Sequence, residues 1–108
     1  MSALSKILRS VEGGRIMFRC PGCEAAGRGF AHVVTVDPPP GYVGSVWSWN
    51  GNAESPTISP SVLCTGRPGE VCHLFLTDGR IQYLGDCTHS MAGQRVPLPD
   101  FNHPEFEA

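Results

Sequence analysis

The chain has 108 residues, which suits one domain and is too short for two separately cored units. Its formal net charge is -2 and its Lys and Arg residues are scattered, so the basic patch of a typical nucleic-acid-binding domain is missing. No apolar stretch is long enough to span a membrane, and the sequence lacks the apolar core of a signal peptide, so we expect a protein that is not secreted.

The composition favours short elements and reduced cysteines. Thirteen Gly and ten Pro residues predict frequent turns rather than long helices. A loop-rich domain of this size buries a limited core, so a cross-link would stabilise it noticeably. Five cysteines are an odd number, and cytosolic thiols stay reduced, so metal ligation or plain burial is expected rather than a disulfide framework.

Three segments in the first third of the chain have short-element patterns. Residues 4–11 fit a short strand or a single helical turn. Residues 15–20 alternate as a half-buried strand does, and residues 30–36 repeat that pattern. The inward faces of the two alternating segments are predicted to carry Ile16, Phe18 and Cys20, and Phe30, His32, Val34 and Val36.

Two less regular segments follow a stiff triple-proline connector. Residues 45–50 place Trp47 and Trp49 on one strand face, either as buried core or as a contact patch for a partner. Residues 57–64 are rich in β-branched side chains but contain Pro60, which predicts an edge strand or an irregular one.

The clearest element is a hairpin over residues 71–86. Two alternating runs flank Asp78-Gly79, and Asp-Gly between such runs is typical of a two-residue type I′ turn. A turn centred there places Leu76 opposite Ile81 and Leu74 opposite Tyr83.

A metal site is predicted first at Cys20-Pro21-Gly22-Cys23, which has the spacing of a zinc knuckle. Redox proteins use the same spacing, but they need a helix that begins at the motif. The residues that follow Cys23 include Gly27 and Gly29 and form a poor helix start, so zinc is favoured.

The hairpin supplies candidates for the other two ligands. Its register places Cys72 and Cys87 on one face at the open end, so the expected site is Cys20, Cys23, Cys72 and Cys87 around structural zinc. His89 lies on the same side as Cys87 and can replace Cys72. The other alternates are His73, whose simpler interpretation is a residue satisfied by a carbonyl or by Asp86, and His32, whose apolar neighbours favour burial; Cys64 is expected to be a small buried hydrophobe.

These features together predict an all-β fold, a small zinc-ribbon-like antiparallel sheet with long loops. The expected organisation is a single zinc-binding domain over residues 1–98, followed by an acidic tail over residues 99–108. Zinc binding would supply folding free energy that the Gly- and Pro-rich core lacks.

Four stretches of the sequence resemble one family of short bacteriophage and prophage proteins. They are VEGGRIMFRCPGC (11–23), Trp49-Asn50-Gly51, Pro56-Thr57-Ile58-Ser59-Pro60-Ser61 and CHLFLTDGRIQYLGDCTHSMAG (72–93). Such proteins are sometimes labelled ammonia monooxygenase, which does not suit this chain because it has no membrane span and no copper motif. The resemblance implies a phage origin and a family pattern of Cys20, Cys23, His32, Cys72, His73, Cys87 and His89.

The function expected from these residues is a phage interaction module with a closed structural metal site. Its partner would be a phage or host protein, and it would act in the virion or the host cytoplasm, with no membrane and no nucleic acid. One alternative is a zinc-dependent hydrolase with an open site, in which Asp86 or Glu24 acts as base and His73 or His89 as proton shuttle. A second alternative is a small zinc-ribbon regulator that binds nucleic acid.

Overall fold

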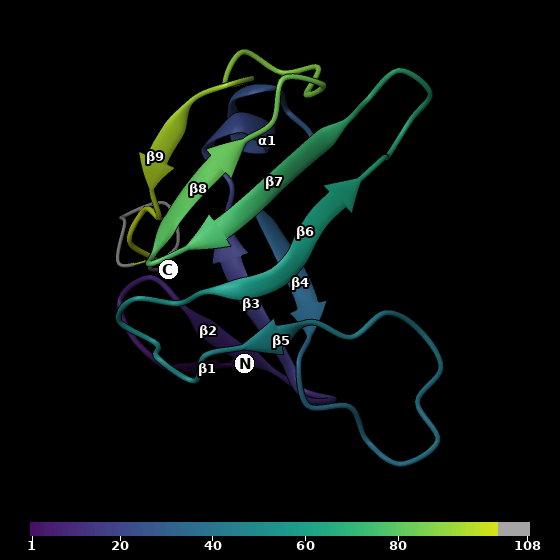
Figure 1. The fold of residues 1–108 in the computed structure, drawn as a ribbon, viewed down its shortest axis with the longest axis vertical. Helices are drawn as coiled ribbons and strands as arrows, with labels where there is room; N and C mark the ends of the chain where they lie inside the picture. The colour runs from purple at the N-terminus through teal and green to yellow at the C-terminus, as the bar shows by residue number, and fades with distance from the viewer. Residues whose placement is uncertain (102–108) are drawn as a thin grey trace.

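The computed structural model describes residues 1–101, which form two antiparallel sheets and one short helix (Figure 1). Strands of the first sheet pair in chain order: β1 (Ser2–Ala3), β2 (Arg9–Val11), β3 (Arg15–Arg19) and β4 (Ala31–Thr35). The second sheet is also ordered along the chain: β5 (Ser48–Trp49), β6 (Ile58–Cys64), β7 (Cys72–Thr77), β8 (Arg80–Tyr83) and β9 (Arg95–Pro97). The helix α1 (Pro21–Ala25) follows β3 directly.

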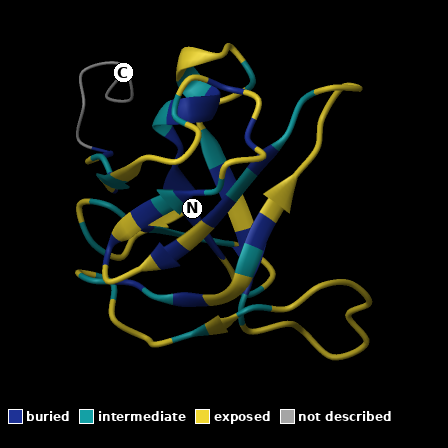
Figure 2. Cartoon of the chain, turned by 45° about the horizontal axis from the view of Figure 1, so that its top comes forward, coloured by how far each residue is buried: buried dark blue, intermediate teal, exposed yellow. Residues whose placement is uncertain are grey.

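The two sheets pack against each other around one apolar core, and the prediction of an all-β antiparallel fold is confirmed. Both sheets contribute fully or almost fully buried side chains to it: Leu8, Ile16, Phe18, Val34, Ile58, Val62, Leu74, Leu76, Ile81 and Tyr83. The connection between β4 and β5 lies outside this core and is exposed over residues 37–46 (Figure 2).

The predicted hairpin is present with its predicted register. Leu76 pairs with Ile81 and Leu74 with Tyr83. Asp78 and Gly79 have φ angles of 50° and 73°, the positive values that a type I′ turn requires. Along β7 the side chains alternate, so that Cys72, Leu74 and Leu76 are buried while those between them face outward.

The strand β6 is irregular, as its proline predicts. Ile58 pairs with Leu76 and Val62 pairs with Leu74. Between these two pairs β6 advances by four residues while β7 advances by only two. The extra residues include Pro60 and Ser61, which lie in a bulge of the kind that re-aims side chains next to functional sites.

The sequence predicted a poor helix start after Cys20-Pro21-Gly22-Cys23, and this expectation is wrong. A helix does begin at Cys20-Pro21-Gly22-Cys23, with Cys20 as its N-cap, because the Cys20 thiol accepts a hydrogen bond from the Cys23 amide and Pro suits the first helical turn. The strand β9 carries no alternation that would predict it. Most of the expected acidic tail, residues 102–108, lies outside the described residues. Within residues 1–101 no helix is long and apolar enough to cross a membrane.

The core assignment predicts the effect of truncating one β7 side chain. Leu76 is 0% exposed, so Leu76→Ala should lower the free energy of unfolding by about 2–5 kcal/mol, measured by urea denaturation. The matched control Val43→Ala alters a side chain that is 94% exposed and should change stability by less than about 0.5 kcal/mol. Equal effects of the two substitutions would contradict this core.

Candidate functional site

A buried cluster of three thiols and one imidazole lies between the two sheets. The ligand atoms of Cys20, Cys23, Cys72 and His89 all lie within 4.8 Å of one another, and all four residues are buried. The Cys20 and Cys72 sulfurs are 3.8 Å apart, and Nε2 of His89 is 3.3 Å from the Cys72 sulfur. Soft sulfur and nitrogen donors converging in this way can hold a metal ion.

The four residues of the cluster come from three separate segments of the chain. Cys20 and Cys23 come from the cap and first turn of α1, Cys72 from the start of β7, and His89 from the segment after β8. Gly22 leaves space for the His89 ring, since a Cβ added at Gly22 would lie 2.6 Å from Nε2 of that ring. This glycine is therefore part of the site although it offers no ligand atom.

Two further side chains contact the cluster. The Tyr83 hydroxyl lies 3.1 Å from the Cys20 sulfur and accepts a hydrogen bond from the Gly22 amide at 3.0 Å. Nε2 of His32 lies 3.7 Å from the Cys23 sulfur and 3.5 Å from the Cys72 sulfur. His32 is thus close enough to donate a hydrogen bond to these sulfurs or to compete with His89 as the fourth ligand.

Mutual hydrogen bonding separates the pKa values of the thiols. Bonds from the Cys23 and Cys72 thiols hold the pKa of Cys20 far below its usual range. The hydrogen bond with Cys20 raises the pKa of Cys23 to about 12, and it also strongly raises the pKa of Cys72. Burial lowers the pKa of His89, which favours the neutral imidazole that binds metals.

Cys87, the fourth ligand expected from the sequence, is not part of this cluster. The expectation extended the β8 register through Cys87, but β8 ends at Tyr83 and a turn follows, in which the Cys87 amide bonds to the Leu84 carbonyl. The Cys87 sulfur instead lies 3.2 Å from both the amide nitrogen and the carbonyl oxygen of His73. Cys64, which was expected to be buried, is exposed at the end of β6.

The neighbour of Cys72 belongs to a second constellation, on the outer face of the sheet. Nε2 of His73 lies 3.0 Å from Oγ of Ser61, and Nδ1 of His73 lies 3.0 Å from Oδ2 of Asp86. Because a carboxylate only accepts hydrogen bonds, Nδ1 carries the proton and Nε2 is left to accept from the Ser61 hydroxyl. This is the connectivity of a Ser-His-Asp catalytic triad.

Sequence reasoning reached two of these three residues. It paired His73 with Asp86 and gave both residues roles only in the zinc-hydrolase alternative, as proton shuttle and base, and it did not single out Ser61. A signal was present, since Ser61 follows the Pro60 that makes β6 irregular, and irregular strands often present functional side chains.

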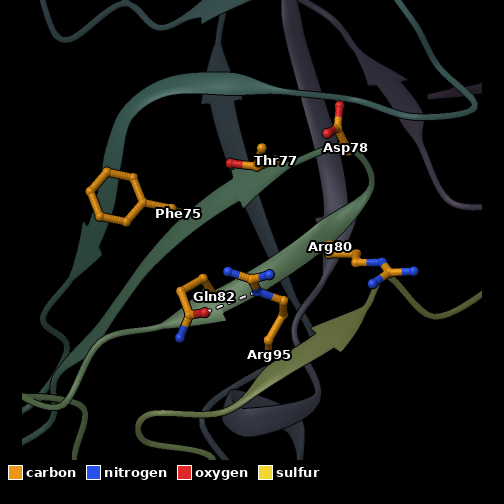
Figure 3. Close-up of a pocket in the computed structure, with 6 residues that line it drawn as sticks. All are labelled: Phe75, Thr77, Asp78, Arg80, Gln82 and Arg95. Carbon is orange, nitrogen blue, oxygen red and sulfur yellow. Dashed lines mark hydrogen bonds between the residues drawn. The ribbon is translucent and has the colours of Figure 1, made fainter.

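A hollow with polar and aromatic walls lies on the outer face of the second sheet, further along β7 from His73. His73, Phe75 and Thr77 share that face because β7 alternates. The hollow has a volume of about 550 Å³ and is lined by Phe75 and Thr77 but not by His73 (Figure 3). Arg80 and Arg95 also line it, and Nε of Arg95 donates to Gln82 at 3.1 Å. The exposed fractions of the His73 and Asp86 side chains are 24% and 56%, so both side chains are in contact with solvent.

The two tryptophans lie beside this site. Trp47 and Trp49 are both partly buried and pack against the core, which matches the buried alternative more than an open contact patch. The Trp47 indole donates a hydrogen bond to the Ser61 carbonyl at 3.2 Å and so fixes the backbone that carries the serine.

Because Gly22 packs against the His89 ring, a larger residue at this position is expected to weaken metal binding by the cluster. Gly22→Ala should displace the His89 ring and weaken metal binding about 10- to 100-fold, measured as bound metal per chain during titration with a chelator. The matched control is Gly85→Ala, since no atom lies within 4 Å of a Cβ added there. Unchanged affinity in Gly22→Ala would show that His89 is not a ligand.

Comparison with known proteins gives one finding. A sequence model of the family described as "Bacterial ubiquitination-like system serine protease (BubE)" matches residues 3–84, about three quarters of the chain. No curated protein and no solved structure matches. The matched region contains Ser61, His73 and the three clustered cysteines, and it ends before Asp86 and His89.

This match overturns the function expected from the sequence. The family description names a serine protease of a bacterial ubiquitination-like system, so the expected phage interaction module is wrong, whereas the resemblance to phage proteins stays a prediction. The description names neither of the alternatives, a zinc-water hydrolase and a nucleic-acid-binding regulator. The chain belongs to the BubE family of bacterial ubiquitination-like system serine proteases.

Proposed function

We propose that this protein is a serine protease in which Ser61 is the nucleophile, His73 the general base and Asp86 the residue that orients the base. The observation that carries the proposal is the pair of 3.0 Å contacts made by the two ring nitrogens of His73. The family description supports the same reaction class.

The proposed reaction has two steps that use the same groups. Oγ of Ser61 attacks the scissile carbonyl while Nε2 of His73 takes its proton, and His73 then gives that proton to the leaving amine. The acyl-enzyme ester is hydrolysed by a water whose proton passes to His73, which returns a proton to Ser61. Asp86 keeps the imidazole in the required tautomer and stabilises the imidazolium.

We further propose that the buried cluster holds zinc in a structural role. Two sulfurs bound to tetrahedral zinc lie about 3.8 Å apart, and a sulfur and a nitrogen about 3.5 Å apart. The 3.8 Å between Cys20 and Cys72 and the 3.3 Å between Cys72 and His89 agree with those values. A site with three cysteines and one histidine is closed, so zinc there would cross-link α1 to the hairpin rather than act on substrate.

The proposed substrate is a protein of the ubiquitination-like system named in the family description. The hollow on the same face of β7 as His73 supports binding of a protein, because Phe75 is 43% exposed there and Arg80 and Arg95 outnumber the one acidic lining residue, Asp78. Aromatic and arginine side chains are enriched at protein interfaces.

Substitutions in the triad test the proposed reaction. With p-nitrophenyl esters of short peptides as substrates, Ser61→Ala should remove enzymatic turnover, and Asp86→Asn should lower kcat by about 100-fold or more by disturbing the His73 tautomer. The control Ser59→Ala alters an exposed serine two residues earlier on β6. Turnover by Ser61→Ala equal to that of the unaltered protein would reject Ser61 as the nucleophile.

Metal removal tests the structural role. Stripping the metal with a tight chelator should lower Tm by 10 °C or more, because zinc binding in such sites contributes folding free energy of order 10 kcal/mol. Cys20→Ser should reproduce the loss, whereas Cys64→Ser, at an exposed thiol, should keep Tm within about 2 °C. An unchanged melting curve after verified metal removal would contradict a structural metal.

A further inference from the structure

The strand that carries Ser61 has an open edge beside the nucleophile. On one side, β6 pairs with β7 through Val62, Leu63 and Cys64. On the other side, β5 pairs only with Ile58 and Ser59. Within the described part of the chain, no strand covers that second edge of residues 60–64, and Figure 1 shows β6 ending at the rim of its sheet.

The register decides which backbone groups face the open edge. The His73 carbonyl accepts a hydrogen bond from the Leu84 amide, and the His73 amide points to the Cys87 sulfur, so both groups face away from β6. Leu63, directly opposite His73, therefore belongs to a pair without mutual hydrogen bonds. Its own N–H and C=O point away from β7, toward the open edge.

Beyond Ser61 along β6, Leu63 is the first residue whose N–H and C=O both face the open edge, because Val62 forms a hydrogen-bonded pair with Leu74. The Ser61 carbonyl already accepts the hydrogen bond of the Trp47 indole. Leu63 is 58% exposed, so this position lies at the surface of the molecule. Two residues of extended strand separate Leu63 from Ser61, about 7 Å, which corresponds to two or three substrate residues.

We propose that the substrate binds as an added β-strand on this edge, with one residue of its acyl segment exchanging backbone hydrogen bonds with Leu63. The proposal rests on the proposed function and deepens it, because it defines the substrate class as an extended peptide segment ending at the scissile carbonyl. The acyl segment is chosen because it stays attached to Ser61 through both chemical steps and must be held in each. Main-chain pairing of this kind provides affinity without requiring a particular side chain.

The experiment replaces single amides of the substrate. The probes are p-nitrophenyl esters of acetylated penta-alanine in which each amide N–H in turn is replaced by an ester oxygen. One replacement, two or three residues before the scissile bond, should lower kcat/KM about threefold to tenfold, because it removes the donor to the Leu63 carbonyl. Replacements on either side of it should change kcat/KM by less than about twofold, since their N–H groups face away from β6.

A protein variant tests the other half of the pair. Leu63→Pro removes the outward N–H, which β7 does not use, and proline is tolerated at edge positions of this kind. The ratio of kcat/KM for the penta-alanine ester to that for p-nitrophenyl acetate should fall about threefold to tenfold relative to Leu63→Ala, which keeps the N–H. If Leu63→Pro does not fold, the amide scan on the unaltered protein remains decisive.

The outcomes separate this inference from the proposed function. A flat amide profile together with Ser61-dependent hydrolysis would overturn strand addition and leave the protease assignment intact. Absence of Ser61-dependent hydrolysis would overturn both. If a second copy of the chain filled the edge instead, sedimentation would show a dimer and turnover per chain would fall with rising enzyme concentration, which also overturns the proposal.

Discussion

The alternation of side chains along β7 is the constraint on which the rest of this structure depends. Cys72 and His73 are consecutive, so a regular strand sends them to opposite faces. Cys72 enters the buried cluster that could hold a metal ion, and His73 lies on the outer face with Ser61 and Asp86. A shift of one residue in the pairing of β7 would exchange the two faces and destroy both sites together. The Asp78-Gly79 turn and the buried Leu74 and Leu76 hold that register.

The segment after β8 carries Asp86 and His89 and is held against the start of β7 by hydrogen bonds. The amide of Thr88 bonds to the Val71 carbonyl, and the Thr88 hydroxyl accepts a hydrogen bond from the Val71 amide, which fixes the chain between Asp86 and His89 against the start of β7. Cys87 lies within that stretch and binds the His73 backbone through its sulfur. The proposed zinc site would thus hold the base and its orienting carboxylate in place without touching substrate, which explains how a loop-rich domain can keep a triad preorganised.

The sequence predicts those features of the fold and site that depend on neighbouring residues better than those that depend on contacts between distant parts of the chain. The hairpin and its register follow from local turn chemistry at Asp78-Gly79, and Cys20, Cys23 and Cys72 follow from spacing and strand alternation. Cys87 was misplaced because the strand ends early at Tyr83, which alternation alone does not reveal. Ser61 was not recognised because no sequence motif marks it. It lies in the bulge of β6 and contacts His73 on the neighbouring strand β7. The proposal of a catalytic role for Ser61 therefore needed the tertiary structure and the family match.

The proposed mechanism depends most on Ser61, which must be an activated nucleophile on the face of β7 opposite the buried thiol cluster. The most direct measurement is to treat the metal-loaded protein with a fluorophosphonate and to map the adduct by peptide mass spectrometry. An activated Ser61 should give a single adduct, which is lost in Asp86→Asn at matched exposure times. An adduct on another serine, or none under conditions in which the protein remains folded, would contradict this mechanism.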